Sequence, residues 1–149
     1  MTVARLVSGG QTGVDRAALE VGRERGIPIG GWCPAGGLAE DLTEPPGVLR
    51  LFPELTPTES ADPRERTERN VRDTDATLIL LPPSVVSPGT LLTIDLARRL
   101  GKRHLVADPA HHGLVRSWLP PGLLNVAGPR ESEAPGIHDA VAVLLRAIL

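Results

Sequence analysis

The sequence predicts a single α/β domain over residues 1–149, with a parallel sheet of about five strands between two layers of helices, a Rossmann-like three-layer fold. Short apolar runs typical of strands alternate along the chain with segments typical of helices. The run at 77–81 is apolar without polar alternation, which is typical of a strand covered on both faces. A chain of 149 residues is also the size of one ordinary domain.

Five apolar runs are the expected strands, at residues 4–7, 27–29, 76–81, 104–107 and 123–127. Four helices are expected between and after them, at residues 12–26, 62–72, 90–101 and 137–149. Thr12 and Thr90 are the expected caps of the first and third helices, and Pro63 suits the first position of the second. Residues 32–60 form a long irregular connection, which in a compact domain is often functional.

The composition excludes several classes of protein. A net charge of -2 gives no electrostatic footprint for nucleic acid, and no apolar stretch is long enough to span a membrane. The one cysteine allows no internal disulfide and fits a cytoplasmic protein. The four histidines show no metal-ligand spacing, so no metal site is expected.

A glycine-rich turn joins the first strand to the first helix. It is made of Ser8, Gly9, Gly10, Gln11, Thr12 and Gly13. In a parallel sheet this turn lies at the carboxyl edge, where backbone N–H groups at a helix N-terminus favour an anion such as phosphate. Its spacing is neither that of a Walker A loop nor the full dinucleotide fingerprint. The alternative interpretation is a tight structural turn.

Two charged residues follow this turn. Asp15 would compete with an anion for the positive end of the helix dipole. We expect it either to accept a ligand hydroxyl or amine, or to stabilise the dipole at the surface. Arg16 is the expected charge partner of the anion.

Cys33 follows the second strand, within a segment rich in glycine and proline, and is a ligand-binding candidate by its position at the same edge. It would act as a nucleophile or soft ligand only if a basic neighbour lowered its pKa, and no histidine or lysine is adjacent. A packed thiol is therefore the favoured interpretation.

The helix at 62–72 carries charged pairs and a candidate binding face. Glu65 with Arg69 and Glu68 with Arg72 have the spacing and order of stabilising surface pairs. Arg66 and Asn70 lie together on another face and are expected to point toward the cleft. A pair between Asp62 and Arg66 is the competing interpretation.

Two further turns are expected at the same edge. Gly89, Thr90 and Thr93 follow the third strand and begin a helix, so a second helix N-terminus can face the first across a cleft. Arg130 follows the fifth strand and can close the same edge, although a plain polar loop is as good an interpretation.

Together these motifs resemble the molybdenum carrier family. The residues that carry the resemblance are those at 8–19, 30–34, 39–41, 66–67, 70–71, 75–77, 89–90, 93 and 128–132, which span nearly the whole chain. The resemblance implies a Rossmann-like fold, a homo-oligomer, which we expect to be a dimer or tetramer, and storage or delivery of molybdenum cofactor without turnover.

The family is similar in fold to the lysine-decarboxylase-like phosphoribohydrolases, which use an arginine and a glutamate around a glycine-rich turn. By this resemblance Arg66 stands where their arginine would be, and Thr93 stands where their glutamate would be. Without that carboxylate, acid–base chemistry at a ribosyl bond lacks its obvious group. A nucleotide N-glycosidase is therefore the alternative function, and the protein is not expected to need catalysis.

The sequence thus predicts a protein that binds a phosphate-bearing small molecule, nucleotide-like or a pterin such as molybdenum cofactor, between the turns at Gly10 and Gly89. Backbone N–H groups of residues 10–13 would hold the phosphate, Arg16 and Arg66 would neutralise it, and Thr90 or Thr93 would donate hydrogen bonds. An assembly module with a vestigial pocket is the third possibility.

Overall fold

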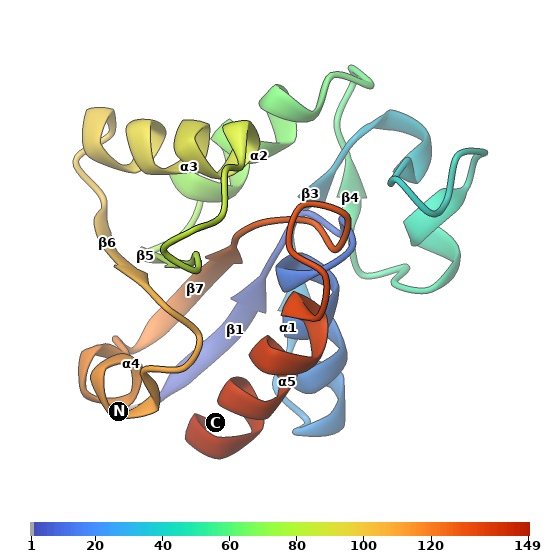
Figure 1. Cartoon of the computed structure of the whole chain (residues 1–149). Helices are drawn as coiled ribbons and strands as arrows, with labels where there is room; N and C mark the ends of the chain where they lie inside the picture. Colours follow the sequence, from blue (N-terminus) through green and yellow to red (C-terminus); the bar gives the residue numbers. More distant parts are fainter. Residues whose placement is uncertain (1) are drawn as a thin grey trace.

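A computed structural model describes residues 2–149 and contains a five-stranded, all-parallel sheet in the order β2-β1-β7-β5-β6 (Figure 1). The strands of this sheet are β1 (Val3–Val7), β2 (Ile29–Gly30), β5 (Ala76–Leu80), β6 (Arg103–Ala107) and β7 (Gly122–Ala127). The predicted Rossmann-like α/β fold is confirmed. The last strand along the chain lies in the middle of the sheet, an order that the sequence pattern did not define.

In residues 2–149, five α-helices cover the sheet. They are α1 (Val14–Glu24), α2 (Pro63–Arg72), α3 (Pro88–Arg99), α4 (His112–Trp118) and α5 (Ile137–Ile148). α2 and α3 pack together on one face, and α1 and α5 pack together on the other, with α4 beside α5 (Figure 1). The layers are therefore helix, sheet and helix, as parallel strands with crossover helices require.

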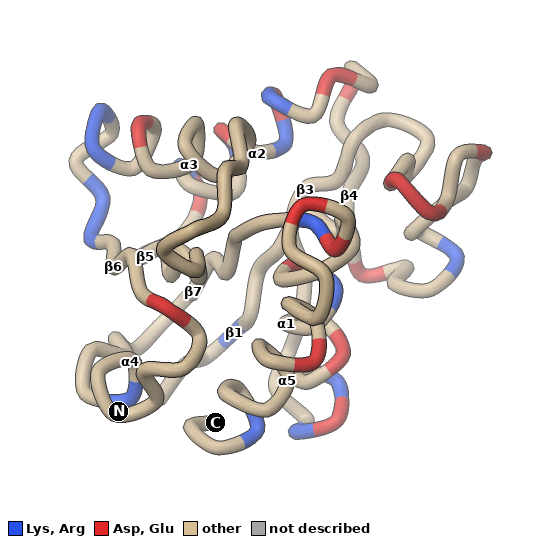
Figure 2. Tube along the Cα trace, viewed as in Figure 1, with Lys and Arg blue, Asp and Glu red and all other residues tan. Residues whose placement is uncertain are grey.

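The core lies between the central strands and the helices. All five residues of β5 are buried, which confirms that the apolar run is covered on both faces. Neither β5 nor β7 carries a charged residue, whereas the helices and loops around them do (Figure 2). Burying apolar strands in this way contributes about 25 cal/mol per Å² of surface removed from water.

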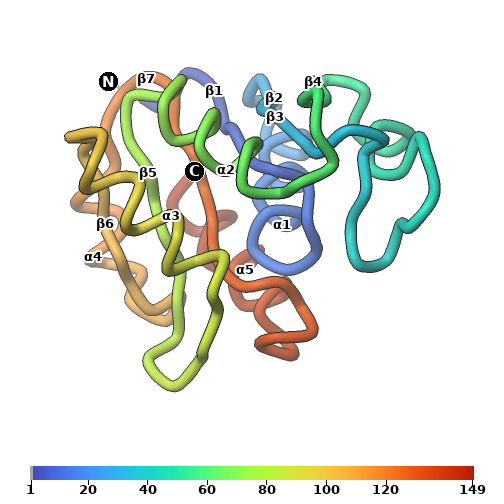
Figure 3. Tube along the Cα trace, turned by 90° about the horizontal axis from the view of Figure 1, so that it is seen from above, coloured from blue at the N-terminus to red at the C-terminus, as the bar shows by residue number. Residues whose placement is uncertain are grey.

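The long connection is partly ordered into short elements. It contains β3 (Trp32–Cys33), β4 (Thr56–Pro57) and two 3₁₀ turns, η1 (Ala35–Gly37) and η2 (Gly47–Arg50). β3 and β4 pair in a second, two-stranded parallel sheet. This segment lies at the β2 end of the main sheet, away from β6 (Figure 3). Its side chains Val48, Phe52 and Leu55 are buried in the main core, so the connection is packed onto the domain.

Two predicted helix caps are wrong. α1 begins after Gly13, which has a φ of 77°, and Thr12 does not cap it. The N–H of Val14, the first residue of the helix, donates to the carbonyl of Pro129. α3 is capped by Ser87, whose hydroxyl accepts from the N–H of Thr90. Both threonines are thereby released for other bonds. In residues 2–149, no helix is long and apolar enough to cross a membrane.

Candidate functional site

A pocket of about 260 Å³ opens at the carboxyl edge of the central strands. The chain runs from β1 out to β2, crosses to β5 and β6, and returns to β7 between the two halves. Such a change of direction is where open parallel sheets leave a crevice between helices of opposite faces. The loops after β1 and β7, together with α1, α2 and α3, supply its walls.

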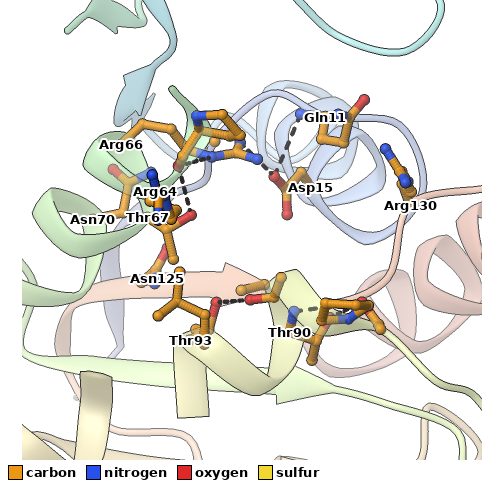
Figure 4. Close-up of a pocket in the computed structure, with 18 of the residues that line it drawn as sticks. Gln11, Asp15, Arg64, Arg66, Thr67, Asn70, Thr90, Thr93, Asn125 and Arg130 are labelled. Atoms are coloured by element: carbon orange, nitrogen blue, oxygen red, sulfur yellow. Dashed lines mark hydrogen bonds and ion pairs between the residues drawn. The ribbon is translucent and has the colours of Figure 1, made fainter. Parts of the chain in front are cut away.

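The structure brings nine of the predicted site residues together in this pocket, namely Gly9, Gln11, Asp15, Arg66, Asn70, Gly89, Thr90, Thr93 and Arg130. Figure 4 shows Asp15 and Arg66 on one wall, with Thr90 and Thr93 opposite them. Six predicted residues do not line it, namely Ser8, Gly10, Thr12, Gly13, Arg16 and Cys33. Each of these six has an internal partner or a packed position.

The glycines of the first turn serve mainly close packing. A Cβ at Gly13 would overlap the backbone carbonyl of Pro129, and a Cβ at Gly10 would press on Val48 and Leu55. Both positions also have positive φ, which favours glycine. Within this turn, only Gly9 and Gln11 line the pocket. The turn therefore positions the pocket wall, and most of it faces the protein interior.

Arg16 is held by the protein itself. Its Nη1 and Nη2 lie 2.8 and 2.9 Å from the two carboxylate oxygens of Asp41, and Nη2 donates to the carbonyl of Gly10 at 3.1 Å. The hydrogen bonds from Arg16 lower the pKa of Asp41 below its ordinary value. Arg16 is buried and ties the long connection to the glycine-rich turn.

Ser8, Thr12 and Cys33 are also internal. The Ser8 hydroxyl donates to the carbonyl of Val126 at 2.8 Å, which joins the ends of β1 and β7. The Thr12 hydroxyl donates to Glu40 and accepts from the N–H of Glu131. Cys33 is fully buried, and burial raises the pKa of its thiol. The thiol is therefore not activated as a nucleophile.

Asp15 and Arg66 form an ion pair inside the pocket. Nη1 of Arg66 lies 3.3 Å from Oδ2 of Asp15, and the N–H of Gln11 donates to the same oxygen at 3.4 Å. The two side chains are 13% and 10% exposed. Burial raises the pKa of Asp15 above its ordinary value, and the positive charge of Arg66 is the strongest opposing influence. Nε of Arg66 also donates to the carbonyl of Pro63, which aims the side chain over Gly9.

The other predicted pairs of α2 are partly present. Glu65 and Arg69 form the expected ion pair at 2.7 Å. Arg72 pairs with the adjacent Asp73, and Glu68 is not its partner. Asp62 pairs with Arg64 and caps the helix, so it does not compete for Arg66.

Asn70 has a second duty besides its place in the pocket wall. Its side-chain oxygen accepts from the N–H of Trp32 at 2.7 Å, and its amide donates to the carbonyl of the same residue at 3.0 Å. These two bonds give partners to both backbone polar groups of Trp32 and so attach α2 to the small sheet.

The opposite wall is the N-terminus of α3. The Ser87 hydroxyl contacts the Thr90 hydroxyl at 2.7 Å and donates to Glu133 at 3.1 Å. Thr93 donates to the carbonyl of Gly89 at 3.1 Å, so its hydroxyl is turned along the helix. A Cβ at Gly89 would meet nothing within 4 Å, and the backbone there is open to a ligand. The helix dipole favours an anion at this position.

Sequence reasoning missed Asn125, Arg64 and Glu133, which also line the pocket. Asn125 is the one polar side chain inside β7 and is buried. A polar residue in the middle of an apolar strand is a signal that could have identified it, because buried polar groups need partners. Arg64 and Glu133 lie close in the sequence to residues that were predicted to bind the ligand, Arg66 and Arg130, and were not themselves predicted.

Arginines and carboxylates are paired around the pocket. Arg66 and Arg130 lie beside the two lining carboxylates, Asp15 and Glu133, and Arg64 is paired with Asp62. Glu133 is engaged by Ser87 and by the N–H of Arg130, so its negative charge is already hydrogen-bonded. Within residues 2–149, no group of three or more histidine, cysteine, aspartate or glutamate side chains is placed to hold a metal ion.

A parallel α/β sheet with a pocket at the carboxyl ends of its strands places this chain among the Rossmann-like folds. The chain belongs to the circularly permutated YpsA SLOG family, whose model matches residues 6–149. It is 35% identical to the putative molybdenum carrier protein from Syntrophus aciditrophicus SB, with a TM-score of 0.88 over 99% of this chain and 96% of that one. The predicted resemblance to molybdenum carriers is confirmed. No curated protein matches the chain.

Proposed function

We propose that the pocket binds a phosphate-bearing organic molecule, nucleotide-like or a pterin, and that the protein holds this ligand without turnover. Molybdenum cofactor is the first candidate, because the similar protein from Syntrophus aciditrophicus is named as a molybdenum carrier. The observation that carries the proposal is that Arg66 and the exposed N-terminus of α3 line the same pocket. At this helix end the N–H groups of Thr90 and Leu91 are bonded to Ser87, and the N–H of Gly89 is left for a ligand. A guanidinium and a free backbone N–H are donors that phosphate groups use.

The phosphate site in this proposal differs from the one that the sequence suggested. Gly10, Thr12 and Gly13 do not line the pocket, whereas Gly89 is exposed at the second position of α3 and has open space around it. The anion is therefore assigned to the α3 side, with Arg66 or Arg130 as its charge partner. The pocket volume of about 260 Å³ is near the lower end of small-molecule sites.

A matched pair of variants tests this assignment. Gly89→Asp places a negative charge at the pocket end of α3, and Gly113→Asp places the same charge at the second position of α4. Both glycines are exposed, a Cβ at either would meet nothing within 4 Å, and an acid in the first turn suits both helix dipoles. Both variants are therefore expected to fold.

The measurement is thermal unfolding with nucleoside monophosphates and pterin phosphates, since a ligand that binds only the folded state raises the melting temperature. We expect stabilisation of the wild type and of Gly113→Asp, and none of Gly89→Asp. Equal stabilisation of all three proteins would place the ligand elsewhere. Mass spectrometry of the purified protein then identifies a ligand that co-purifies.

A nucleotide N-glycosidase remains the second candidate, because Asp15 brings a carboxyl group beside Arg66 in the same pocket. Burial raises the pKa of this carboxyl, a property that general acids require. Thr93 cannot replace a carboxylate, because its hydroxyl donates to a backbone carbonyl. Release of free base from a nucleoside monophosphate, lost in Asp15→Asn, would favour the enzyme over the carrier.

Assembly into a dimer or tetramer stays a prediction of the family resemblance. Several apolar side chains are exposed on this chain, including Val86 at 79% and Val143 at 57%. Light scattering during size-exclusion chromatography measures the mass in solution. A mass of one chain would contradict the prediction.

A further inference from the structure

Asp15 has one carboxylate oxygen that the protein leaves free. Both hydrogen bonds to this carboxylate, from Arg66 and from the N–H of Gln11, go to Oδ2. Oδ1 accepts no hydrogen bond from residues 2–149, and it points into the pocket (Figure 4). Ser8 lies close enough to influence the pKa of Asp15, but its one hydroxyl proton goes to the carbonyl of Val126.

This free oxygen belongs to a side chain that is mostly buried. The Asp15 side chain is only 10% exposed, and its partner Arg66 is 13% exposed. In residues 2–149 no side-chain polar atom without a partner is fully buried, so Oδ1 keeps contact with solvent in the pocket. A ligand that covers Oδ1 has to supply a donor, because an unsatisfied buried polar group costs about 1–3 kcal/mol. The pocket therefore offers an acceptor whose missing donor has to come from the ligand or from water.

Glu133 is the other acid that lines the pocket, and it differs from Asp15 in its exposure and in its partners. Its Oε1 accepts from the Ser87 hydroxyl and from the N–H of Arg130, each at 3.1 Å. Its side chain is 18% exposed and lies near Nε of Arg130. Its Oε2, like Oδ1 of Asp15, accepts no hydrogen bond from residues 2–149, but Glu133 is the more exposed acid and is not the ion-pair partner of Arg66. Removal of either acid takes one negative charge out of the same pocket.

We propose that the free oxygen of Asp15 makes the pocket selective for anions that carry a hydrogen-bond donor, and that it excludes tetrahedral oxyanions without a proton, such as sulfate and molybdate. Phosphate that retains a proton and phosphate esters with a neighbouring hydroxyl or amino group can donate to Oδ1. Sulfate and molybdate at neutral pH have only acceptors, so an oxygen of theirs would face an oxygen of Asp15. Like charges brought together in this way are strongly disfavoured.

This inference rests on the proposed function, because it assumes that the arginine-rich pocket takes an anion. It adds a statement about which anion. A protein of this kind would hold molybdenum as part of an organic molecule with hydroxyl or amino donors, and would not hold bare molybdate in this pocket.

The test compares wild type, Asp15→Asn and Glu133→Gln. Titration calorimetry at pH 7 measures the affinity of each protein for inorganic phosphate, sulfate and molybdate. An asparagine amide fills nearly the same space as Asp15, and it has N–H groups that can donate to an oxyanion. We expect Asp15→Asn to gain about tenfold or more in affinity for sulfate and molybdate.

The ratio of phosphate affinity to sulfate affinity is the specific readout. This ratio should fall more in Asp15→Asn than in Glu133→Gln, because Glu133→Gln removes the same charge from a more exposed position and leaves the free oxygen beside Arg66 in place. Wild-type protein that binds sulfate as tightly as phosphate would overturn the inference. An unchanged ratio in Asp15→Asn, or an equal fall in both variants, would also overturn it.

The outcome is separable from that of the proposed function. If no nucleotide or pterin phosphate stabilises the wild type, the proposed function fails, while the oxyanion affinities of the variants still decide the role of Asp15. If organic phosphates bind and sulfate binds equally well, only the selectivity of Asp15 is wrong. Circular dichroism of all three proteins establishes that each is folded before the titrations are compared.

Discussion

The guanidinium of Arg66 lies directly over the backbone of Gly9, in space that a Cβ at Gly9 would fill. This contact joins α2 to the end of β1 and leaves Nη1 facing Asp15. Glycine at this position is needed for the approach of a side chain, since its φ is not in the positive range. The first turn therefore shapes the pocket through Arg66 as well as through its own backbone.

Gly9→Ala is expected to impair ligand binding and leave stability nearly unchanged. The new Cβ meets only the end of a flexible side chain, which can move away at small cost. Arg66 would then lose its position beside Asp15. Thermal unfolding with and without ligand measures both effects, and the ligand-dependent shift should shrink while the melting temperature of the free protein stays within a few degrees.

Gly13→Ala is the contrasting change in the same turn. Its Cβ would overlap the carbonyl of Pro129 and the backbone of Arg130 at a φ of 77°, so the backbone itself would have to move. Loss of about 2 kcal/mol or more in the free energy of unfolding is expected. If the two alanine variants unfold alike, the distinction drawn between these glycines is wrong.

Arg16→Lys tests whether Arg16 is structural, as its internal bonds indicate. Arg16 uses its planar guanidinium for two bonds to Asp41 and for the carbonyl of Gly10, which a lysine cannot reproduce. We expect a loss of about 1 kcal/mol in urea unfolding, moderated because Asp41 is partly exposed. Ligand affinity should change little.

Arg66→Lys is the matched variant for that experiment. Arg66 lines the pocket and Arg16 does not, so Arg66→Lys should lower ligand affinity more than Arg16→Lys does. A larger loss of ligand affinity in Arg16→Lys would instead support Arg16 as the charge partner of the anion.

Ser87→Ala is expected to destabilise α3, because its hydroxyl caps the helix and also donates to Glu133. Removing a serine cap costs about 1 kcal/mol. Ser117→Ala is a suitable control, since that exposed hydroxyl only donates to the carbonyl one turn earlier in α4. Denaturant unfolding should show a loss for Ser87→Ala and almost none for Ser117→Ala.

His138, on α5, makes the stability of the protein depend on pH through its bonds to Glu20 and Asp139. Partial burial lowers the pKa of His138, but hydrogen bonds to Asp139 and Glu20 outweigh this and raise the pKa above 6.5. Nε2 lies 2.6 Å from Glu20 on α1, so the charged imidazole links the two helices. A raised folded pKa means that the stabilisation is complete below the unfolded value and is lost as pH rises through the folded value.

His138→Ala should therefore be less stable than the wild type at pH 6, with a difference that narrows toward pH 9. Melting temperatures measured at intervals across this range test the prediction. Glu20→Gln removes the partner on α1 and should flatten the same profile. A difference between His138→Ala and wild type that does not vary with pH would contradict the assignment.

The fold was predictable because its signals are local. The buried run of β5, the glycine-rich turns and the proline at the start of α2 each depend on neighbouring residues. α4 was not predicted, because its seven residues bury only Val115 and give no clear periodicity. The position of β7 in the sheet depends on pairings between distant residues, which periodicity does not define.

The site was predictable in its location and less so in its roles. Loops that follow parallel strands meet at one edge, so residues as distant as Asp15 and Thr93 were expected together. The sequence could not show that Arg16 would form an ion pair with Asp41, or that Gly13 would pack on Pro129. Such assignments depend on which distant segment arrives beside a residue, and that is decided by tertiary packing.

The central place of β7 has a consequence for how this chain is made. Until residues 122–127 leave the ribosome, the edges of β1 and β5 that they will join have no strand beside them. These exposed edges are able to pair with other chains, and the risk of aggregation grows with the time during which the edges stay unpaired. Because Val126 and Gly128 also line the pocket, the pocket is incomplete until this part of the chain has been made.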